Sequence, residues 1–311
     1  MKFPVKTLKS VIIILLYANI SCSSQLPEEK PFQNSKFIEI DEIKFHYREW
    51  LQESPTAYPH VLLIHGFSGS TYSWRYTTDS LYSIGYNVVA VDFPPYGYSD
   101  RDLDINTSTT AIAKTINSFK DSLYPEVSWH IIGHSMGGGI AQAMVTQYPK
   151  NIVSVVFVAG ALYSQVEKNE VQAPWPLRLC FIENLLASIG DNFFITKKRV
   201  KEFLASAYGS EPSEEEVEEY YKALNIPGTS QAIIRSKTKS PEIFAFSASE
   251  INVPAYGIWG EQDSWVPLSR IKPALEKMPD VKIETIPGCG HNPMETHHEE
   301  FMKLLLEFLE K

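Results

Sequence analysis

A serine lies between two glycines in residues 133–137, which read Gly-His-Ser-Met-Gly. The apolar run 129–132 precedes this pentapeptide, and an apolar pattern with helical spacing follows it over 140–145. In such a strand–turn–helix setting, a Gly-x-Ser-x-Gly turn holds its serine in a strained conformation above a sheet. The N–H groups of the following helix then point towards any anion that develops beside the serine. We therefore predict that Ser135 is a nucleophile.

A serine hydroxyl needs a neighbouring base, and that base needs an orienting acid. Among the eight histidines, His291 lies in the glycine-rich loop 288–293, between the last apolar strand and the last helix. This position is at the carboxyl end of the predicted sheet, the same end as Ser135. We predict that His291 is the base. We expect other histidines to be structural, solvated or turned away from the nucleophile: His46, His60, His130, His134, His297 and His298.

The segment 259–267 follows an earlier predicted strand and supplies two candidate acids, Glu261 and Asp263. Either acid gives the chain order nucleophile, acid, histidine. The bend expected at 264–267 favours Asp263, because it turns that carboxylate inwards. Glu261 follows a glycine where the chain is just leaving the sheet, and it remains the alternative at this point.

Strands and helices alternate around these residues, which is typical of the α/β class. Short apolar runs that end at Gly, Asp or Pro predict strands buried on both faces of a mostly parallel, open sheet with helices on both sides. The predicted strands are 61–64, 88–91, 129–132, 153–158, 255–259 and 281–286. An antiparallel hairpin is expected at 37–40 and 43–47, and a last amphipathic helix at 301–309.

Residues 161–247 interrupt this alternation. They contain Pro174-Trp175-Pro176, many aromatic residues and a capping-box pattern at Ser213 and Glu216 that opens an acidic helix. We interpret them as a helical insertion between two strands of the sheet. The predicted core is therefore divided into 37–160 and 248–311.

Together these motifs resemble the α/β-hydrolase fold superfamily, of the lid-bearing serine esterase and lipase type, over residues 37–311. Besides the serine elbow, His-Gly-Phe-Ser-Gly at 65–69 resembles the family's oxyanion loop. Residues 92–100 resemble its Asp-x-Pro-Gly-x-Gly-x-Ser loop, with Pro95 where glycine is usual. That replacement leaves the conformation of the turn open. The insertion 161–247 matches the position of the family's cap.

The resemblance implies the roles of further residues. The backbone N–H groups of Phe67 and Met136 would hold the oxyanion, and the acid maps onto Asp263. Relatives that dehalogenate or open epoxides use aspartate at the elbow, so Ser135 points to an acyl-enzyme, with no metal or organic cofactor required. We expect hydrolysis of small-molecule esters with apolar acyl groups. The pocket-lining aromatic residues of the cap would be Trp175, Phe181, Phe193, Phe194, Phe203 and Tyr208.

Two other interpretations remain open. A carbon–carbon bond hydrolase acting on a diketone-like ring-cleavage product would share the serine triad, although an exported location argues against it. A ligand-binding sensor would keep the triad without turnover. The net charge of −9 argues against a nucleic-acid partner. Three cysteines form neither a disulfide scaffold nor a zinc pattern, and whether Cys180 and Cys289 pair stays open.

The N-terminus has the pattern of an export signal. Three lysines precede the apolar run 11–17, and residues 1–21 are predicted to be a signal peptide. Asn-Ile-Ser-Cys at 19–22 resembles a bacterial lipoprotein signal, with Asn19 where leucine is usual. We expect Cys22 to be lipidated, 22–36 to be a tether, and the protein to be membrane-anchored in the periplasm or at the outer surface. Ordinary cleavage after Ser21 or Ser23 is the alternative.

Substituting Cys22→Ser tests this expectation. If Cys22 carries acyl chains, the substitution releases soluble protein or blocks processing, because each buried methylene contributes about 0.8 kcal/mol to anchoring. Detergent partitioning and mass spectrometry of the first peptide measure both effects. An unmodified N-terminal peptide that begins beyond Cys22 rules out the anchor.

Overall fold

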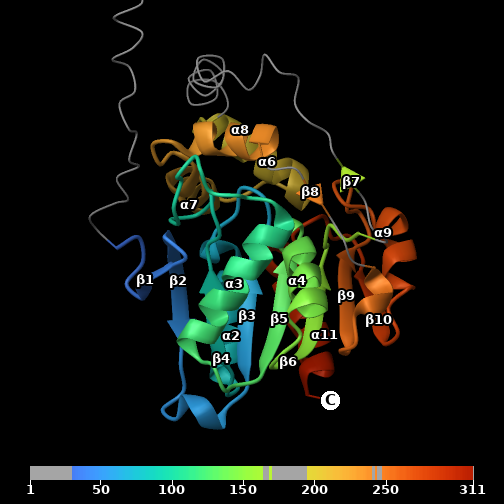
Figure 1. Ribbon diagram of the computed structural model, residues 1–311. Coiled ribbons are helices and arrows are strands. Elements are labelled where there is room, and N and C mark those ends of the chain that lie inside the picture. The colour runs from blue at the N-terminus through green and yellow to red at the C-terminus, as the bar shows by residue number, and fades with distance from the viewer. Residues whose placement is uncertain (1–29, 164–167, 170–194, 240–241, 244–246, 311) are drawn as a thin grey trace, which may run out of the picture.

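The computed structural model describes residues 30–163, 168–169, 195–239, 242–243 and 247–310 (Figure 1). The predicted signal peptide, Cys22, Cys180 and most of the predicted tether lie outside these ranges. Within them, no helix has the length and apolar character needed to cross a membrane.

Eight strands form one mixed sheet in the order β1-β2-β4-β3-β5-β6-β9-β10. The β1–β2 and β2–β4 pairs are antiparallel, and the remaining neighbours are parallel, which confirms the predicted mostly parallel sheet. The strands are β1 Ser35–Ile40, β2 Ile43–Trp50, β3 His60–Ile64, β4 Asn87–Val91, β5 Trp129–His134, β6 Ile152–Val158, β9 Ala255–Gly260 and β10 Val281–Ile286. The first strand begins at Ser35, two residues before the predicted core boundary.

Helices cover both faces of the sheet, as predicted (Figure 1). They are α2 Arg75–Ser83, α3 Thr109–Leu123, α4 Met136–Gln147, α9 Leu268–Leu275, α10 Pro293–Thr296 and α11 His298–Leu309. Alternate residues of a strand point to opposite faces. Accordingly, Leu62 of β3 packs in one apolar cluster with α3, α4 and α9 residues, whereas Leu63 packs in the other with α2 and α11 residues.

Among the described residues of the insertion after β6, three helices lie above the carboxyl ends of the parallel strands (Figure 1). They are α6 Lys197–Tyr208, α7 Glu214–Leu224 and α8 Thr229–Lys239. The Ser213–Glu216 capping box at the start of α7 is present, as predicted. The short strands β7 Lys168–Asn169 and β8 Glu242–Ile243 pair with each other, a ribbon that the sequence did not predict. We call residues 161–247 the cap from here on.

The loop 92–100 is organised around the buried carboxylate of Asp92. This carboxylate accepts hydrogen bonds from the N–H groups of Thr71, at 2.6 Å, and Tyr98, at 2.8 Å. Gly97 has φ +59°, and a Cβ atom there would lie 2.1 Å from the Asp92 Cγ atom. The turn with Pro95 in place of glycine contains a cis peptide bond between Pro94 and Pro95. Only glycine fits at position 97.

Asp92 also belongs to a second Ser–His–Asp arrangement. The His46 ring lies 2.7 Å from Asp92 Oδ2 through Nδ1 and 2.7 Å from Ser35 Oγ through Nε2. None of the three residues has exposed surface. A substrate cannot reach them, so this arrangement joins β1, β2 and the loop after β4 rather than forming an active site. His46 is structural, as expected.

Gly97→Ala measures how closely this loop packs. The alanine side chain meets both an unfavourable positive φ and the Asp92 carboxylate, so the free energy of unfolding should fall by roughly 3 kcal/mol. Gly209→Ala is the matched control, because Gly209 has φ +72° with no atom within 4 Å of the added Cβ. The control should cost only about 1 kcal/mol. Equal losses in denaturant unfolding would contradict the close contact with Asp92.

Candidate active site

Ser135 occupies the sharp turn between β5 and α4. Its φ of 50° and ψ of −118° fall outside the conformations that residues other than glycine usually adopt. A Cβ atom at Gly133 would lie 2.3 Å from the carbonyl oxygen of Gly137, and one at Gly137 would lie 2.4 Å from that of Ile64. The two flanking glycines are therefore required by close backbone packing, and the elbow forms as predicted.

Hydrogen bonds hold the strained backbone of Ser135 in place. Its N–H donates to the carbonyl of Val158 at 3.0 Å. Its own carbonyl accepts from the N–H groups of Gly138, at 2.9 Å, and Ala161, at 2.8 Å. Because every backbone polar group of Ser135 is paired, the strand after the elbow and the start of the cap both stabilise the turn.

Asp263 orients the His291 ring through a hydrogen bond. His291 Nδ1 lies 2.9 Å from Asp263 Oδ2, and both side chains are almost fully buried. A carboxylate only accepts hydrogen bonds, so Nδ1 carries the proton and Nε2 is left with a lone pair. The other carboxylate oxygen of Asp263 accepts the N–H groups of Trp265 and Val266, each at 2.9 Å. The geometry thus suits His291 to act as a base.

Glu261 lies away from this pair. Glu261 is exposed, and its carboxylate accepts a hydrogen bond from the hydroxyl of Thr285 at 3.3 Å. Of the two candidate acids, the structure brings Asp263 to His291 and leaves Glu261 at the surface. The bend after Asp263 explains why this acid faces inwards. Two backbone N–H groups of the bend donate hydrogen bonds to the Asp263 carboxylate and hold it in that orientation.

The cap contacts the histidine loop directly. The His291 N–H donates to the carbonyl of Ala207 in α6 at 2.7 Å. A Cβ atom at Gly290 would lie 2.6 Å from the same carbonyl oxygen, so the loop and the helix touch through their backbones. The Trp265 ring stacks near the His291 ring, with centroids 5.5 Å apart. Core and cap together therefore fix the position of His291.

Ser135 and His291 both line a cavity of about 190 Å³, which we call the inner cavity. Gly66 and Phe67 of the predicted oxyanion loop line it as well. Met136 follows Ser135 directly and is the first residue of α4, so its N–H belongs to the unpaired first turn of that helix. The positions of Phe67 and Met136 suit the predicted binding of an oxyanion, which stays a prediction.

His134 lines the inner cavity too, although we expected it to turn away from the nucleophile. Adjacent side chains are expected to diverge at the turn, but the centroid of the His134 ring lies 4.9 Å from that of the His291 ring. Its Nε2 donates to the carbonyl of His291 at 3.0 Å. Burial lowers the pKa of His134 well below 6.5, so the ring is neutral and Nδ1 has a lone pair. Nδ1 of His134 packs against Gly66, because a Cβ atom added to Gly66 would lie 2.8 Å from it.

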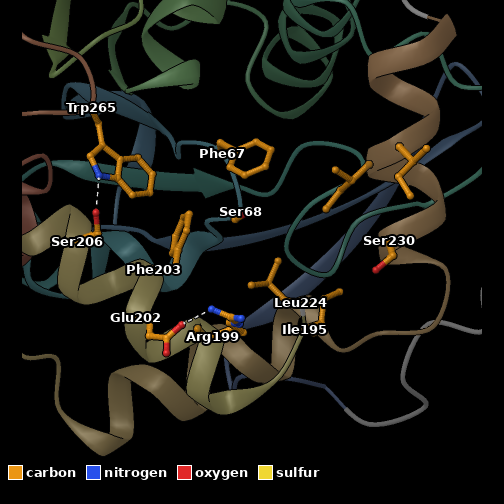
Figure 2. Close-up of a pocket in the computed structure, with 13 residues that line it drawn as sticks. Phe67, Ser68, Ile195, Arg199, Glu202, Phe203, Ser206, Leu224, Ser230 and Trp265 are labelled. Carbon is orange, nitrogen blue, oxygen red and sulfur yellow. Dashed lines mark hydrogen bonds and ion pairs between the residues drawn. The ribbon is translucent and has the colours of Figure 1, made fainter. Parts of the chain in front are cut away.

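A second, larger cavity has a volume of about 720 Å³, and Figure 2 shows the residues that line it. We call it the outer cavity, and it adjoins the inner one through shared lining residues. Phe67, Phe203 and Trp265 line both cavities. Five other lining side chains are apolar, namely Ile195, Val200, Leu224, Ile233 and Ile234, and five are polar or charged, namely Ser68, Arg199, Glu202, Ser206 and Ser230. Figure 2 shows Arg199 paired with Glu202 on its wall, and the two side chains are 2.7 Å apart.

The predicted aromatic lining is correct for Phe203 and wrong for Tyr208. Tyr208 is buried, and its hydroxyl donates to Glu295 at 2.9 Å instead of facing either cavity. The other four aromatic residues predicted to line the pocket, Trp175, Phe181, Phe193 and Phe194, lie outside the described residues.

Glu295 of α10 is the centre of a buried polar network that sequence reasoning missed. Its side chain has no exposed surface. One carboxylate oxygen accepts from the Tyr220 hydroxyl and the Asn292 amide, each at 2.7 Å. The other accepts from Tyr208 and pairs with Arg75, whose guanidinium also pairs with a glutamate of α7. The network joins the cap to the helix that follows His291.

No sequence signal marked this network, because Glu295 lies in a polar stretch that reads as a solvated helix. Burial and the nearby charge of Glu295 raise the pKa of Tyr220 well above 10, so its hydroxyl stays protonated as a donor.

The buried Cys289 thiol is free, and burial raises its pKa to about 11. Among the described residues, no group of three His, Cys, Asp or Glu side chains is placed to hold a metal ion.

Comparison with known proteins gives consistent matches. Residues 59–298 match the family described as alpha/beta hydrolase fold. A 2-hydroxy-6-oxononadienedioate/2-hydroxy-6-oxononatrienedioate hydrolase from Burkholderia vietnamiensis is 26% identical over 287 residues, which cover 89% of this chain and 96% of the relative.

Solved structures of low sequence identity share the fold. A bacterial membrane phospholipase A has a TM-score of 0.70 and 20% identity, covering 89% of this chain and 85% of that one. An esterase from Exiguobacterium antarcticum has a TM-score of 0.71 and 19% identity, covering 89% and 99%.

Two isosteric substitutions separate the candidate acids. Asp263→Asn should lower kcat for a chromogenic ester by about 10⁴-fold, because a neutral amide no longer holds the required His291 tautomer or stabilises the imidazolium. Glu261→Gln should lower kcat by less than about tenfold, since its side chain is distant from the ring. Steady-state kinetics on both variants measure the two effects. A severe loss confined to Glu261→Gln would reverse the assignment.

Proposed function

This chain belongs to the alpha/beta hydrolase fold family, and on that premise we propose that it is a serine hydrolase that cleaves carboxylic esters with apolar acyl groups. The observation that supports this proposal most is the pair of adjoining cavities. The inner cavity holds Ser135 and the Asp263–His291 pair, and the outer cavity offers a mostly apolar surface. An ester placed across the two would present its carbonyl to Ser135.

The acylation step follows from the proton positions in the site. His291 Nε2, which has the lone pair, takes the proton from Ser135 Oγ as that oxygen attacks the ester carbonyl carbon. The N–H groups of Phe67 and Met136 would stabilise the negative oxygen of the tetrahedral intermediate. Asp263 stabilises the imidazolium of His291. The intermediate collapses when the ester C–O bond breaks and His291 gives its proton to the leaving alcohol.

Water completes the reaction by the same route. His291 takes a proton from a water molecule, whose oxygen attacks the carbonyl carbon of the acyl-Ser135 ester. Breakdown of this second tetrahedral intermediate releases the carboxylic acid and returns the proton to Ser135 Oγ. The cycle uses side-chain and backbone groups of this chain together with water.

The lining of the outer cavity supports an apolar acyl group. Arg199 and Glu202 are the charged residues on its described wall, and they neutralise each other. Burying each methylene of an acyl chain there contributes about 0.8 kcal/mol. Catalytic efficiency should therefore rise with acyl length until the cavity is filled.

Carbon–carbon bond hydrolysis is the second candidate, and sequence similarity favours it. The relatives that match this chain over most of their length include hydrolases of 2-hydroxy-6-oxononadienedioate, a substrate whose name specifies two carboxylates. Recognition of a dicarboxylate calls for cationic side chains or convergent donors. Among the described residues that line the inner cavity there is no lysine or arginine. This difference supports ester hydrolysis over the second candidate.

A series of p-nitrophenyl esters from acetate to palmitate tests the proposal. We expect kcat/KM to rise by up to roughly fourfold per added methylene until the outer cavity is filled, and then to fall. Ser135→Ala should lower turnover by about 10⁴–10⁶-fold, because the nucleophile and base act as a unit. Ser249→Ala, at an exposed position that lines neither cavity, is the matched control.

Two results would contradict the proposal. One is more than a few per cent residual esterase activity in Ser135→Ala, which would exclude the acyl-enzyme. The other is faster cleavage of 2-hydroxy-6-oxononadienedioate than of any ester, which would favour carbon–carbon bond hydrolysis. Binding of esters without turnover by the wild-type protein would favour the sensor interpretation.

A further inference from the structure

The inner cavity has a polar wall that ester cleavage by Ser135 and His291 does not use. Ser73, Tyr220 and Asn292 line this wall, and each is at least nine-tenths buried. Ser73 follows the oxyanion loop, Tyr220 comes from α7 of the cap, and Asn292 follows His291. Their hydrogen bonds determine which atoms can donate and which can only accept.

Glu295 determines which atoms of this wall donate hydrogen bonds and which accept them. Its carboxylate only accepts, so the Tyr220 hydroxyl donates to it at 2.7 Å. That hydroxyl has a single proton, and its oxygen must therefore accept from Ser73 Oγ, 2.8 Å away. Ser73 thereby uses its only proton. Its Oγ atom retains unused lone pairs and has no donor left for a ligand.

Asn292 presents a second acceptor. Its Nδ2 donates to Glu295 at 2.7 Å, which fixes the orientation of the amide, because the carboxylate cannot pair with the amide oxygen. Its Oδ1 atom is buried without a hydrogen-bond partner. A buried acceptor that remains unpaired costs free energy, which a donor bound in the cavity would recover.

His134 contributes a third acceptor to the same cavity. Its Nε2 proton is used on the His291 carbonyl, so Nδ1 can only accept. Three residues that line the inner cavity therefore carry hydrogen-bond acceptors, and the nearby Glu295 carboxylate accepts from Tyr220 and Asn292 of the same wall. Such a wall attracts hydroxyl groups and repels carboxylates.

We propose that the acceptors of Ser73 and Asn292 in this wall, together with that of His134, bind the free hydroxyl groups of the alcohol part of the substrate. The proposal rests on the proposed ester hydrolysis and specifies its substrate class as acyl esters of small polyols. The alcohol belongs in the inner cavity because the outer cavity is larger and mostly apolar, and so suits the acyl chain. A site that pairs with substrate hydroxyls discriminates strongly against analogues that lack them.

Two matched esters test the proposal. Propyl butanoate and 2,3-dihydroxypropyl butanoate have the same skeleton and differ only in two hydroxyl groups. A pH-stat measures butanoic acid released from each, and alkaline hydrolysis rates correct for intrinsic reactivity. We expect the wild-type protein to prefer the dihydroxy ester by at least about tenfold in corrected kcat/KM.

Substitutions assign this preference to the wall. Asn292→Leu keeps the size of the side chain, and Ser73→Ala removes one hydroxyl; each should lower the ratio between the two esters several-fold. Asn252→Leu and Ser83→Ala, at exposed positions, are the matched controls and should keep the wild-type ratio.

Two results would overturn the proposed binding of hydroxyl groups by the wall while leaving the proposed ester hydrolysis intact. One is equal corrected kcat/KM for the two esters in the wild-type protein. The other is a loss in Asn292→Leu and Ser73→Ala that is equal for both esters, which indicates a structural role. Failure of the wild-type protein to cleave either ester would instead overturn the proposed function, and this inference with it.

Discussion

The backbone packs closely around Ser135. This packing fixes the nucleophile, and the other residues of the site are positioned around it. No side chain fits at Gly133 or Gly137, because the backbone of the turn and of the neighbouring strand β3 occupies that space. Ser135 therefore adopts a positive φ, which costs about 1–3 kcal/mol and persists only because the surrounding sheet over-determines it. The buried strands supply this stability, and the strain places the nucleophile where the sheet ends.

A second constraint joins the cap to the core. The carbonyl of Ala207 in α6 accepts the His291 N–H, and Glu295 collects hydrogen bonds from both the cap and the core. Removing one partner of such a buried charged network leaves an unpaired polar group, which is far more costly than losing an exposed pair. The same contacts place Tyr220 of the cap beside Ser73 of the core. The site is thus formed by both parts of the chain.

Sequence reasoning found the residues whose roles depend on local pattern. The Gly-x-Ser-x-Gly turn, the loop with His291 and the bend after Asp263 each follow a predicted strand, and strand ends of a parallel sheet meet at one edge. The mostly parallel direction of the strands could be predicted from the alternation of strands and helices. The start of β1 at Ser35 could not, since its burial depends on the distant His46 ring.

The polar network escaped prediction because its members are far apart in the chain. Arg75 and Glu295 are separated by 220 positions, and Ser73 and Tyr220 by 147. Nothing local distinguishes these residues from solvated ones. His134 was misjudged for a different reason: adjacent side chains are expected to diverge at the turn, whereas the His134 ring lies beside the His291 ring. These contacts depend on tertiary packing, which local patterns do not encode.

Covalent labelling tests the central claim most directly. The central claim is that Ser135 alone is activated for attack, by the His291 ring that is hydrogen-bonded to Asp263. Incubation with a fluorophosphonate, followed by peptide mapping by mass spectrometry, identifies the modified atom. The account predicts one adduct, on the peptide that contains Ser135, together with loss of hydrolysis in proportion to labelling. Full inactivation with the adduct on another residue, or continued hydrolysis by fully labelled protein, would contradict it.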